Sequence, residues 1–237
     1  MTTLHIILLA IIQGLTEFLP VSSSAHLELW HKYIGETEDD LALDIAVHVG
    51  TLGAVILYFW NDVKHAVKGF AHLLRGQLAD PSVHLAICLT IATIPVVLLG
   101  LIMSALGLFE FVRSLAVMGW AMIGFGLLLW WADTKPAETK VAGQWTFKDA
   151  IKLGLWQALA LIPGTSRAGI TITGGLIAGY SREGAARIAM LMSIPTILAS
   201  GAILSLDVVG DANWELAQMA GMAALFAFIA ALFALAF

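Results

Sequence analysis

The sequence predicts an all-α polytopic membrane protein, in which an inverted-topology repeat carries two re-entrant helical hairpins and five transmembrane spans. Of the 237 residues, 59% are hydrophobic and 12% are charged, whereas about a quarter of the residues in a typical soluble domain are charged. Five apolar runs approach the roughly 17 to 25 residues that are needed to cross a bilayer. We therefore expect a single membrane domain over residues 1–237.

The predicted spans are continuous apolar runs with few charges, at 41–60, 83–106, 112–132, 184–206 and 214–237. Basic residues near span ends favour the cytoplasmic side of the membrane. They gather in the loops after the first and third spans, as Lys64, Lys68, Arg75, Lys135 and Lys140. The opposite loops are acidic and are expected outside, with Glu36, Glu38, Asp39, Asp40, Asp207 and Asp211. Segment 64–75 is interpreted as a helix on the lipid surface.

Two further apolar regions, 4–30 and 149–180, are each interrupted at the centre by a proline and a polar cluster. Pro20 and Pro163 lie 143 positions apart in segments that both fit Leu/Ile-Pro-x-x-Ser-x-Ala. Proline removes a helix hydrogen bond, and a following serine or threonine can cap a new helix. Each region is therefore predicted to form two half-helices joined by a turn, which reach from one face to about the bilayer midplane.

Similar hairpins that enter from opposite faces define an inverted-topology repeat. Repeat 1 covers 4–132 and repeat 2 covers 149–237. Repeat 1 contains three predicted spans after its hairpin, whereas repeat 2 contains two before Phe237. The repeat therefore predicts a sixth span that is missing at the C-terminus.

The second hairpin predicts a binding site for an anionic group. Ser166 and Arg167 stand at the expected start of its second half-helix, and Thr171 follows one turn later. Backbone N–H groups and the positive end of the helix dipole attract anions, and arginine can clamp a phosphate with two hydrogen bonds. Ionisable groups at membrane depth are candidates for a functional site.

The first hairpin predicts a carboxylate at the same depth. Gln13 and Glu17 share one helix face, and His26 follows the predicted serine cap. Glu17 would repel an anion unless it were protonated or bound to a hard cation such as Mg²⁺ or Ca²⁺. In a purely structural alternative, Glu17 and Arg167 neutralise each other, the serines cap helices and His26 is a core residue. Asp44 and His48 share a face of the first span, and either line the cavity or join two spans.

Two long motifs resemble one known family. Residues 13–26 read Gln-Gly-Leu-Thr-Glu-Phe-Leu-Pro-Val-Ser-Ser-Ser-Ala-His, and residues 163–171 read Pro-Gly-Thr-Ser-Arg-Ala-Gly-Ile-Thr. They resemble the undecaprenyl pyrophosphate phosphatases of the bacitracin-resistance type, and the similarity runs over nearly the whole chain. The resemblance implies a multi-pass enzyme of the bacterial inner membrane that releases phosphate from undecaprenyl pyrophosphate. It also implies recycling of the peptidoglycan lipid carrier and a site open to the periplasm.

The resemblance also assigns site residues. The family motif Glu/Gln-x-x-x-Glu falls on Gln13 and Glu17, which it associates with a divalent cation, and Glu17 also with catalysis. Catalytic roles are further implied for Ser23, His26 and Arg167. The motif Pro-Gly-x-Ser-Arg-Ser-x-x-Thr has Ala168 where the family commonly has serine. Substrate binding is implied for Ser22, Gly164, Thr165, Ser166, Arg167 and Thr171.

The nucleophile is left open between two routes. Either Ser23 attacks with His26 as its base, or His26 activates a water molecule. In both routes Arg167 binds the pyrophosphate, and the cation at Glu17 and Gln13 offsets its charge.

Other functions fit the sequence less well. A transporter or flippase for an anionic lipid or solute shares the inverted repeat with broken helices. An acid-phosphatase-like lipid phosphatase would need a histidine downstream of Ser166 and Arg167, and none follows. An ion channel would need a ring of pore-lining carbonyls. The net charge of −5 and the scattered basic residues argue against nucleic acid, and a homodimer is left open.

Overall fold

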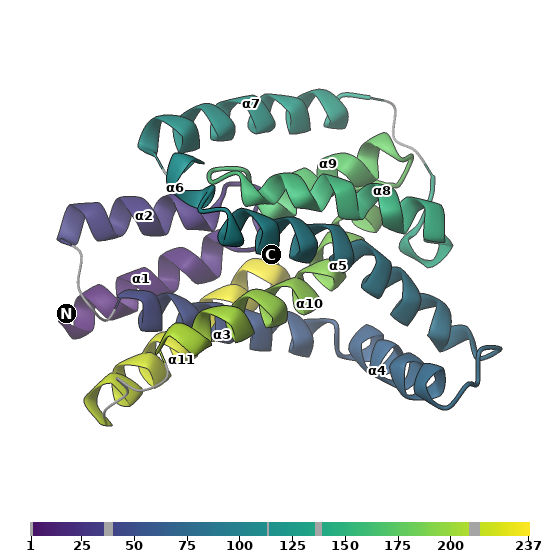
Figure 1. The fold of residues 1–237 in the computed structure, drawn as a ribbon, viewed down its shortest axis with the longest axis horizontal. Helices are drawn as coiled ribbons and strands as arrows, with labels where there is room; N and C mark the ends of the chain where they lie inside the picture. Colours follow the sequence, from purple (N-terminus) through teal and green to yellow (C-terminus); the bar gives the residue numbers. More distant parts are fainter. Residues whose placement is uncertain (1, 36–39, 113, 136–138, 209–213) are drawn as a thin grey trace. The chain divides into compact units, whose positions relative to one another are not determined.

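The computed structural model describes residues 2–35, 40–112, 114–135, 139–208 and 214–237. Among these residues the β pairing is limited to an isolated bridge between Lys140 and Tyr180, so the all-helical prediction is confirmed. In chain order (Figure 1), the elements are α1 (Thr3–Thr16), α2 (Ser23–Ile34), α3 (Asp40–Tyr58), α4 (Trp60–Leu74), α5 (Pro81–Ala105), α6 (Phe109–Val112), α7 (Leu115–Asp133), the short 3₁₀ helices η1 (Ala142–Gln144) and η2 (Leu159–Leu161) on either side of α8 (Phe147–Ala158), α9 (Arg167–Ile177), α10 (Arg182–Val208) and α11 (Trp214–Ala236).

The prediction of five spans is confirmed, because α3, α5, α7, α10 and α11 each contain a stretch long and apolar enough to cross a membrane. The first span ends at Tyr58, and α4 begins at Trp60, earlier than the predicted surface segment 64–75. Of the acidic loop residues, Asp40 begins α3 and Asp207 lies in α10. The others, Glu36, Glu38, Asp39 and Asp211, lie outside the described residues.

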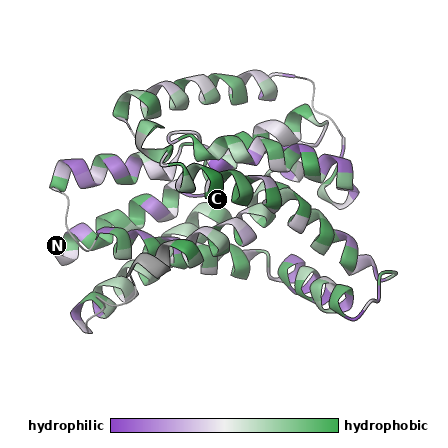
Figure 2. Cartoon of the chain, in the orientation of Figure 1, coloured by the Kyte–Doolittle hydropathy of each residue, from purple (hydrophilic) through white to green (hydrophobic). Residues whose placement is uncertain are grey.

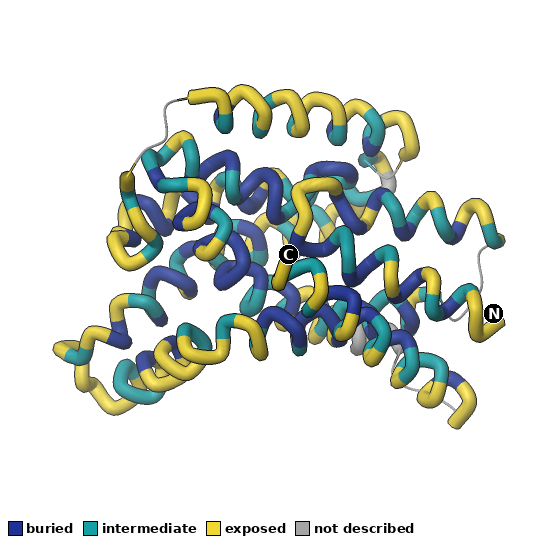
Figure 3. Tube along the Cα trace, turned by 180° about the vertical axis from the view of Figure 1, so that it is seen from behind, coloured by how far each residue is buried: buried dark blue, intermediate teal, exposed yellow. Residues whose placement is uncertain are grey.

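The apolar side chains of the long helices face outward as well as inward. On α7 the exposed fraction is 72% for Trp120, 60% for Leu127 and 67% for Trp130. Figure 2 shows hydrophobic residues along α7, and Figure 3 shows that most of this helix is exposed. Exposed apolar surface of this extent is typical of contact with lipid.

The chain divides into two compact units. Unit 1 contains Met1–Tyr58 and Ile197–Phe237, and unit 2 contains Phe59–Thr196. Unit 1 thus holds the first hairpin, α1 and α2, and unit 2 holds the second hairpin, α8 and α9.

In unit 1 the first half-helix of the hairpin is seated against the C-terminal helix. Both α1 and α3 pack against α11, around a buried apolar core of Ile6, Leu9, Ala10, Leu27, Leu43, Ala46, Val47, Ala223 and Ala227. A Cβ atom on Gly14 would lie 2.6 Å from Cβ of Ala230, and one on Gly50 would lie 2.1 Å from the carbonyl oxygen of Ala224. Small residues at these positions allow the helices to approach closely.

In unit 2 the second hairpin is seated in a similar way. Helix α8 packs against α5, and α9 contacts both α8 and α7. A Cβ atom on Gly154 of α8 would lie 2.7 Å from the carbonyl oxygen of Ala92 on α5. In each unit, therefore, the first half-helix of a hairpin meets a long helix through a glycine, whereas the repeats 4–132 and 149–237 stay predictions. The entry of the hairpins from opposite membrane faces stays a prediction.

Asp149 joins the loop before α8 to the link between α9 and α10. Its Oδ2 atom accepts hydrogen bonds from the Lys140 ammonium at 3.0 Å and from the Tyr180 hydroxyl at 2.9 Å. Burial raises the pKa of this carboxyl, but hydrogen bonds from Lys140 and Tyr180 outweigh burial, so that its pKa lies below the usual range. The ionised carboxylate therefore stabilises the fold.

The Asp149→Asn variant is expected to unfold at a lower temperature than the wild type at neutral pH. A depressed native pKa contributes stability above the unfolded value of about 4, and this contribution is lost as pH falls through the native pKa. The difference in Tm between wild type and variant should therefore narrow as pH falls from about 5 to about 2. Thermal unfolding of both proteins in detergent, followed by circular dichroism, measures it. A difference of constant size over this range would contradict the assignment.

Candidate functional site

The turn of the first hairpin contains a strained serine. Ser22 occupies the N-cap position of α2 with φ 61°, in the left-handed region that serine rarely adopts. Its side chain makes no capping hydrogen bond, so the predicted serine cap is wrong at this residue; its hydroxyl lies 3.3 Å from that of Ser24. His26 Nδ1 donates to the carbonyl oxygen of Ser22 at 2.8 Å, which stabilises the turn. Strain of about 1 to 3 kcal/mol at such positions is common at functional sites.

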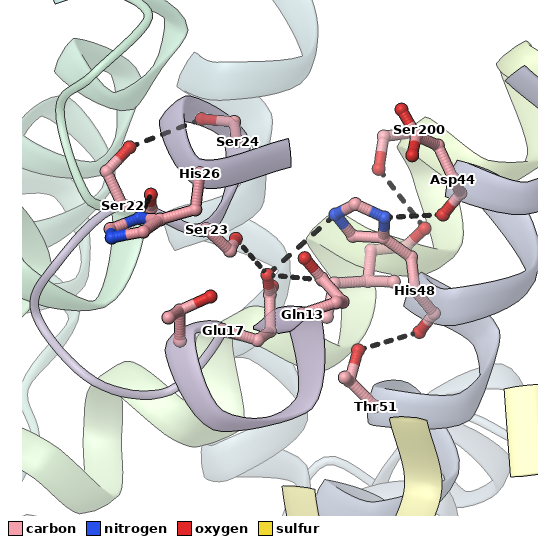
Figure 4. A network of polar contacts seen from close by, with 12 residues as sticks. Gln13, Glu17, Ser22, Ser23, Ser24, His26, Asp44, His48, Thr51 and Ser200 are labelled. Atoms are coloured by element: carbon pink, nitrogen blue, oxygen red, sulfur yellow. Dashed lines mark hydrogen bonds and ion pairs between the residues drawn. The ribbon is translucent and has the colours of Figure 1, made fainter. Parts of the chain in front are cut away.

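The next serine bonds to the carboxylate of the same hairpin. The Ser23 hydroxyl donates to Glu17 Oε2 at 2.6 Å, and the Gln13 side-chain amide donates to the same oxygen at 2.8 Å (Figure 4). Glu17 is 8% exposed and Gln13 is fully buried. Because Glu17 follows the last residue of α1 and Ser23 begins α2, the turn at Pro20 brings the hydroxyl onto the carboxylate.

A histidine from α3 completes this cluster. His48 Nε2 lies 3.8 Å from Glu17 Oε2, and its Nδ1 lies 2.7 Å from the carbonyl oxygen of Asp44. Figure 4 shows the imidazole between Glu17 and Asp44. The side chain of Asp44 in turn bonds to Nε2 of His31 at 3.0 Å. The sequence predicted that His48 either lines the cavity or makes a contact between two spans. The only signal for this prediction was the spacing of Asp44 and His48, which puts them on one helix face.

The oxygen atoms of the cluster suit a hard divalent cation. Gln13 Oε1 is buried and has no hydrogen-bond partner among the described residues, and it belongs to the residue that bonds Glu17. Carboxylate and amide oxygens are ligands that Mg²⁺ and Ca²⁺ accept, and Mg²⁺ usually adds water and substrate phosphate to one or two carboxylates. In the described ranges no group of three His, Cys, Asp or Glu residues could hold a metal by itself. Gln13 and Glu17 thus offer oxygen atoms to a cation whose other ligands would be water and phosphate oxygens.

The turn of the second hairpin requires its glycine. Gly164 follows Pro163 with φ +91°, and a Cβ atom here would lie 2.3 Å from the carbonyl oxygen of Met118 on α7. Backbone conformation and packing both exclude a side chain. The shape of the turn thus explains why the motif has glycine at position 164.

The residues after this glycine begin α9. Ser166 accepts a hydrogen bond from the backbone N–H of Gly169 at 3.1 Å, so the predicted cap is confirmed here. Arg167 is the first residue of α9, and Thr171 donates its hydroxyl to the carbonyl oxygen of Arg167 at 2.8 Å. Thr165 is 3% exposed, and its hydroxyl has no hydrogen-bond partner in the described part of the chain. The buried hydroxyl of Thr165, the arginine Arg167 and the N-terminus of α9 thus belong to one turn.

The structure therefore brings the predicted residues together in two groups. In unit 1, Gln13, Glu17 and Ser23 are joined directly, and Ser22 and His26 are joined beside them. In unit 2, the turn gathers Gly164, Thr165, Ser166, Arg167 and Thr171. The meeting of the two groups around one ligand stays a prediction.

The fold and these turns define a class: a polytopic helical membrane protein whose polar groups lie at the breaks of two interrupted helices. The chain belongs to the family described as Bacitracin resistance protein BacA, whose family model matches residues 6–237.

Several curated relatives are similar over most of the chain. A Roseobacter denitrificans protein named Undecaprenyl-diphosphatase is 58% identical over 236 residues, which cover 100% of this chain and 88% of the relative. A protein of the same name from Dinoroseobacter shibae is 55% identical over 235 residues, 99% of this chain and 88% of the relative. Another, from Saccharophagus degradans, is 48% identical over 219 residues, 91% of this chain and 81% of the relative.

Proposed function

We propose that this chain is an undecaprenyl-diphosphatase, an integral membrane enzyme that hydrolyses undecaprenyl pyrophosphate to undecaprenyl phosphate and phosphate. The observation that carries the proposal is the 2.6 Å hydrogen bond from the Ser23 hydroxyl to the buried Glu17 carboxylate. A hydroxyl beside a base that can take its proton is the usual signature of a nucleophile. The substrate follows from the shared name of the relatives.

Ser23 is proposed as the nucleophile. Its Oγ atom forms a bond to the terminal phosphorus, while the bond from that phosphorus to the bridging oxygen breaks and undecaprenyl phosphate leaves. The hydroxyl proton passes to Glu17, which already accepts its hydrogen bond. Water then hydrolyses the phosphoserine and releases phosphate.

His26 is proposed to act on water. Because its Nδ1 donates to the carbonyl oxygen of Ser22, the neutral ring keeps a lone pair on Nε2. This nitrogen can take a proton from the water that cleaves the phosphoserine. In the competing route, His26 activates the water that attacks the diphosphate directly, and Ser23 only orients Glu17.

The turn of the second hairpin is proposed to bind the diphosphate. Arg167 supplies two parallel N–H donors, and the first N–H groups of α9 add the positive end of the helix dipole. Ser166, Thr165 and Thr171 line the same turn, and the buried hydroxyl of Thr165 is a donor that a phosphate oxygen would satisfy. This role requires the two hairpin turns to face one ligand.

A divalent cation, Mg²⁺ or Ca²⁺, is proposed at Gln13 and Glu17. When bound, it offsets the charge that the diphosphate develops as the bond to the leaving group breaks. The protein residues hold the oxygen ligands at a buried position, where charge interactions are stronger than in water.

The enzyme is proposed to lie in the inner membrane of a bacterium, with its site open to the periplasmic side. There it would regenerate the lipid carrier of peptidoglycan synthesis. By converting undecaprenyl pyrophosphate to undecaprenyl phosphate, it would also confer resistance to bacitracin. A homodimer is part of the same proposal, and size-exclusion chromatography with light scattering tests it.

Phosphate release by the detergent-solubilised protein tests the proposal. With undecaprenyl pyrophosphate and Mg²⁺, the wild type should release phosphate, and rapid quenching should trap a phosphoserine that the Ser23→Ala variant lacks. Full turnover by Ser23→Ala would exclude the serine route and favour water activated by His26. No phosphate release by the wild type would favour a transporter, the class that shares broken helices.

A further inference from the structure

The backbone of α3 fixes the orientation of His48. Its Nδ1 atom lies 2.7 Å from the carbonyl oxygen of Asp44, one turn earlier on the same helix. A carbonyl only accepts, so Nδ1 carries the proton, and Nε2 of the neutral ring has a free lone pair. Histidines that bind metals are usually held in this way, through a hydrogen bond from the other ring nitrogen.

The free nitrogen of His48 faces a carboxylate. Its Nε2 atom lies 3.8 Å from Glu17 Oε2 (Figure 4), which is too long for a hydrogen bond. Two electron-rich atoms at this separation repel each other unless a positive charge lies on the ring or between them. Two ligand atoms of one cation, each roughly 2.1 Å from it, lie about 3 to 4 Å apart.

We infer that His48 Nε2 is a third protein ligand of the divalent cation, beside Glu17 and Gln13. The inference rests on the proposed function and concerns the ion that the site holds. All three residues belong to α1 and α3, or directly follow α1, and both helices pack against α11 in unit 1. Gln13 Oε1, buried and without a hydrogen-bond partner among the described residues, supplies the second oxygen.

A nitrogen ligand changes which cations the site prefers. Imidazole suits borderline transition metals, whereas sites made of oxygen alone suit Mg²⁺ and Ca²⁺. A set of one imidazole, one carboxylate and one amide oxygen therefore favours Co²⁺, and to a smaller degree Mn²⁺, over Ca²⁺. The His48→Gln variant replaces the nitrogen with an amide oxygen and removes this preference.

Mn²⁺ binding to the full chain in detergent, without substrate, tests the inference. The wild type is expected to bind Mn²⁺ at least about tenfold more tightly than His48→Gln, while Ca²⁺ affinity changes by less than about threefold. Electron spin-echo spectra of bound Mn²⁺ should show the modulation of a directly coordinated imidazole nitrogen in the wild type, and this imidazole signal should be absent from His48→Gln. Equal Mn²⁺ affinities, or modulation that persists in the variant, would overturn the inference.

His65→Gln is the matched control, because His65 is an exposed histidine on α4 of unit 2. It should leave both the affinity and the modulation unchanged. If the His48→Gln variant does not fold, the spectrum of the wild type still tests the inference. Bound Mn²⁺ without the modulation of an imidazole nitrogen would overturn it, and a charged His48 paired with Glu17 would then explain the geometry. Because binding is measured without substrate, a wild type that binds Mn²⁺ through His48 but releases no phosphate refutes only the proposed function.

Discussion

Replacing Glu17 with glutamine is expected to lower kcat for phosphate release by at least about 10³-fold. Glutamine has the same length and can still accept the hydrogen bond from Ser23. It cannot take the serine proton, and it brings no charge to a cation. The change is nearly isosteric, so the buried turn should keep its structure. Release of phosphate from saturating undecaprenyl pyrophosphate in detergent measures the effect.

Glu28→Gln is the matched control for this variant. Glu28 lies on α2 of the same hairpin, half-exposed, and pairs with Lys32 at 3.4 Å. Surface ion pairs of this kind contribute little, so kcat should stay within about twofold of the wild type. A Glu17→Gln enzyme that kept more than about a tenth of the wild-type kcat would remove Glu17 from the proposed chemistry.

Replacing Arg167 with lysine is expected to lower kcat/KM by about 10² to 10³-fold. Lysine keeps the positive charge but cannot offer the two parallel donors that a phosphate accepts. The cap of α9 by Ser166 does not depend on the guanidinium, so the helix should remain folded. Initial rates over a range of substrate concentrations separate the effect on KM from that on kcat.

Arg187→Lys provides the control for an arginine-to-lysine change outside the two hairpin turns. A single nitrogen of Arg187, Nη2, donates to both carboxylate oxygens of Asp62 at 2.8 Å. The double variant Glu17→Gln with Arg167→Lys then tests whether both hairpin turns act on one diphosphate. Residues that act as a unit give losses that do not add. Fully additive losses would contradict a shared site.

The spans and the helix breaks could be predicted from the sequence. The spans depend on the length of an apolar run, and the breaks depend on a proline that is followed by polar residues. Crossing the membrane requires a certain length of apolar chain, and α5 and α7 were found close to the predicted 83–106 and 112–132. Proline removes a helix hydrogen bond, and at Pro20 and Pro163, where a polar cluster follows, the helices break and form the hairpin turns. Pro95 and Pro195 lie in apolar runs instead, inside α5 and α10. The cap at Ser166 could be predicted because a serine at the start of a helix can accept a hydrogen bond from a backbone N–H of the first turn.

Details of the first turn could not be predicted, because they depend on backbone angles that no pattern encodes. The motif suggested a capping serine, but the left-handed conformation of Ser22 turns its hydroxyl toward Ser24 instead. The sequence paired Ser23 with His26 as a candidate base, a route that stays untested. In the fold, the Ser23 hydroxyl donates to Glu17 instead, because the turn places the end of α1 beside the start of α2.

Gly14 packs closely against α11, so the position of the Glu17 carboxylate, three residues after Gly14, depends on the C-terminal helix. A bulkier residue at Ala227 or Ala230 would push α1 away from α11 and displace Glu17 with it, although neither alanine carries a reactive group. Genetic variants in α11 that abolish bacitracin tolerance would thus reveal mechanical support rather than chemistry.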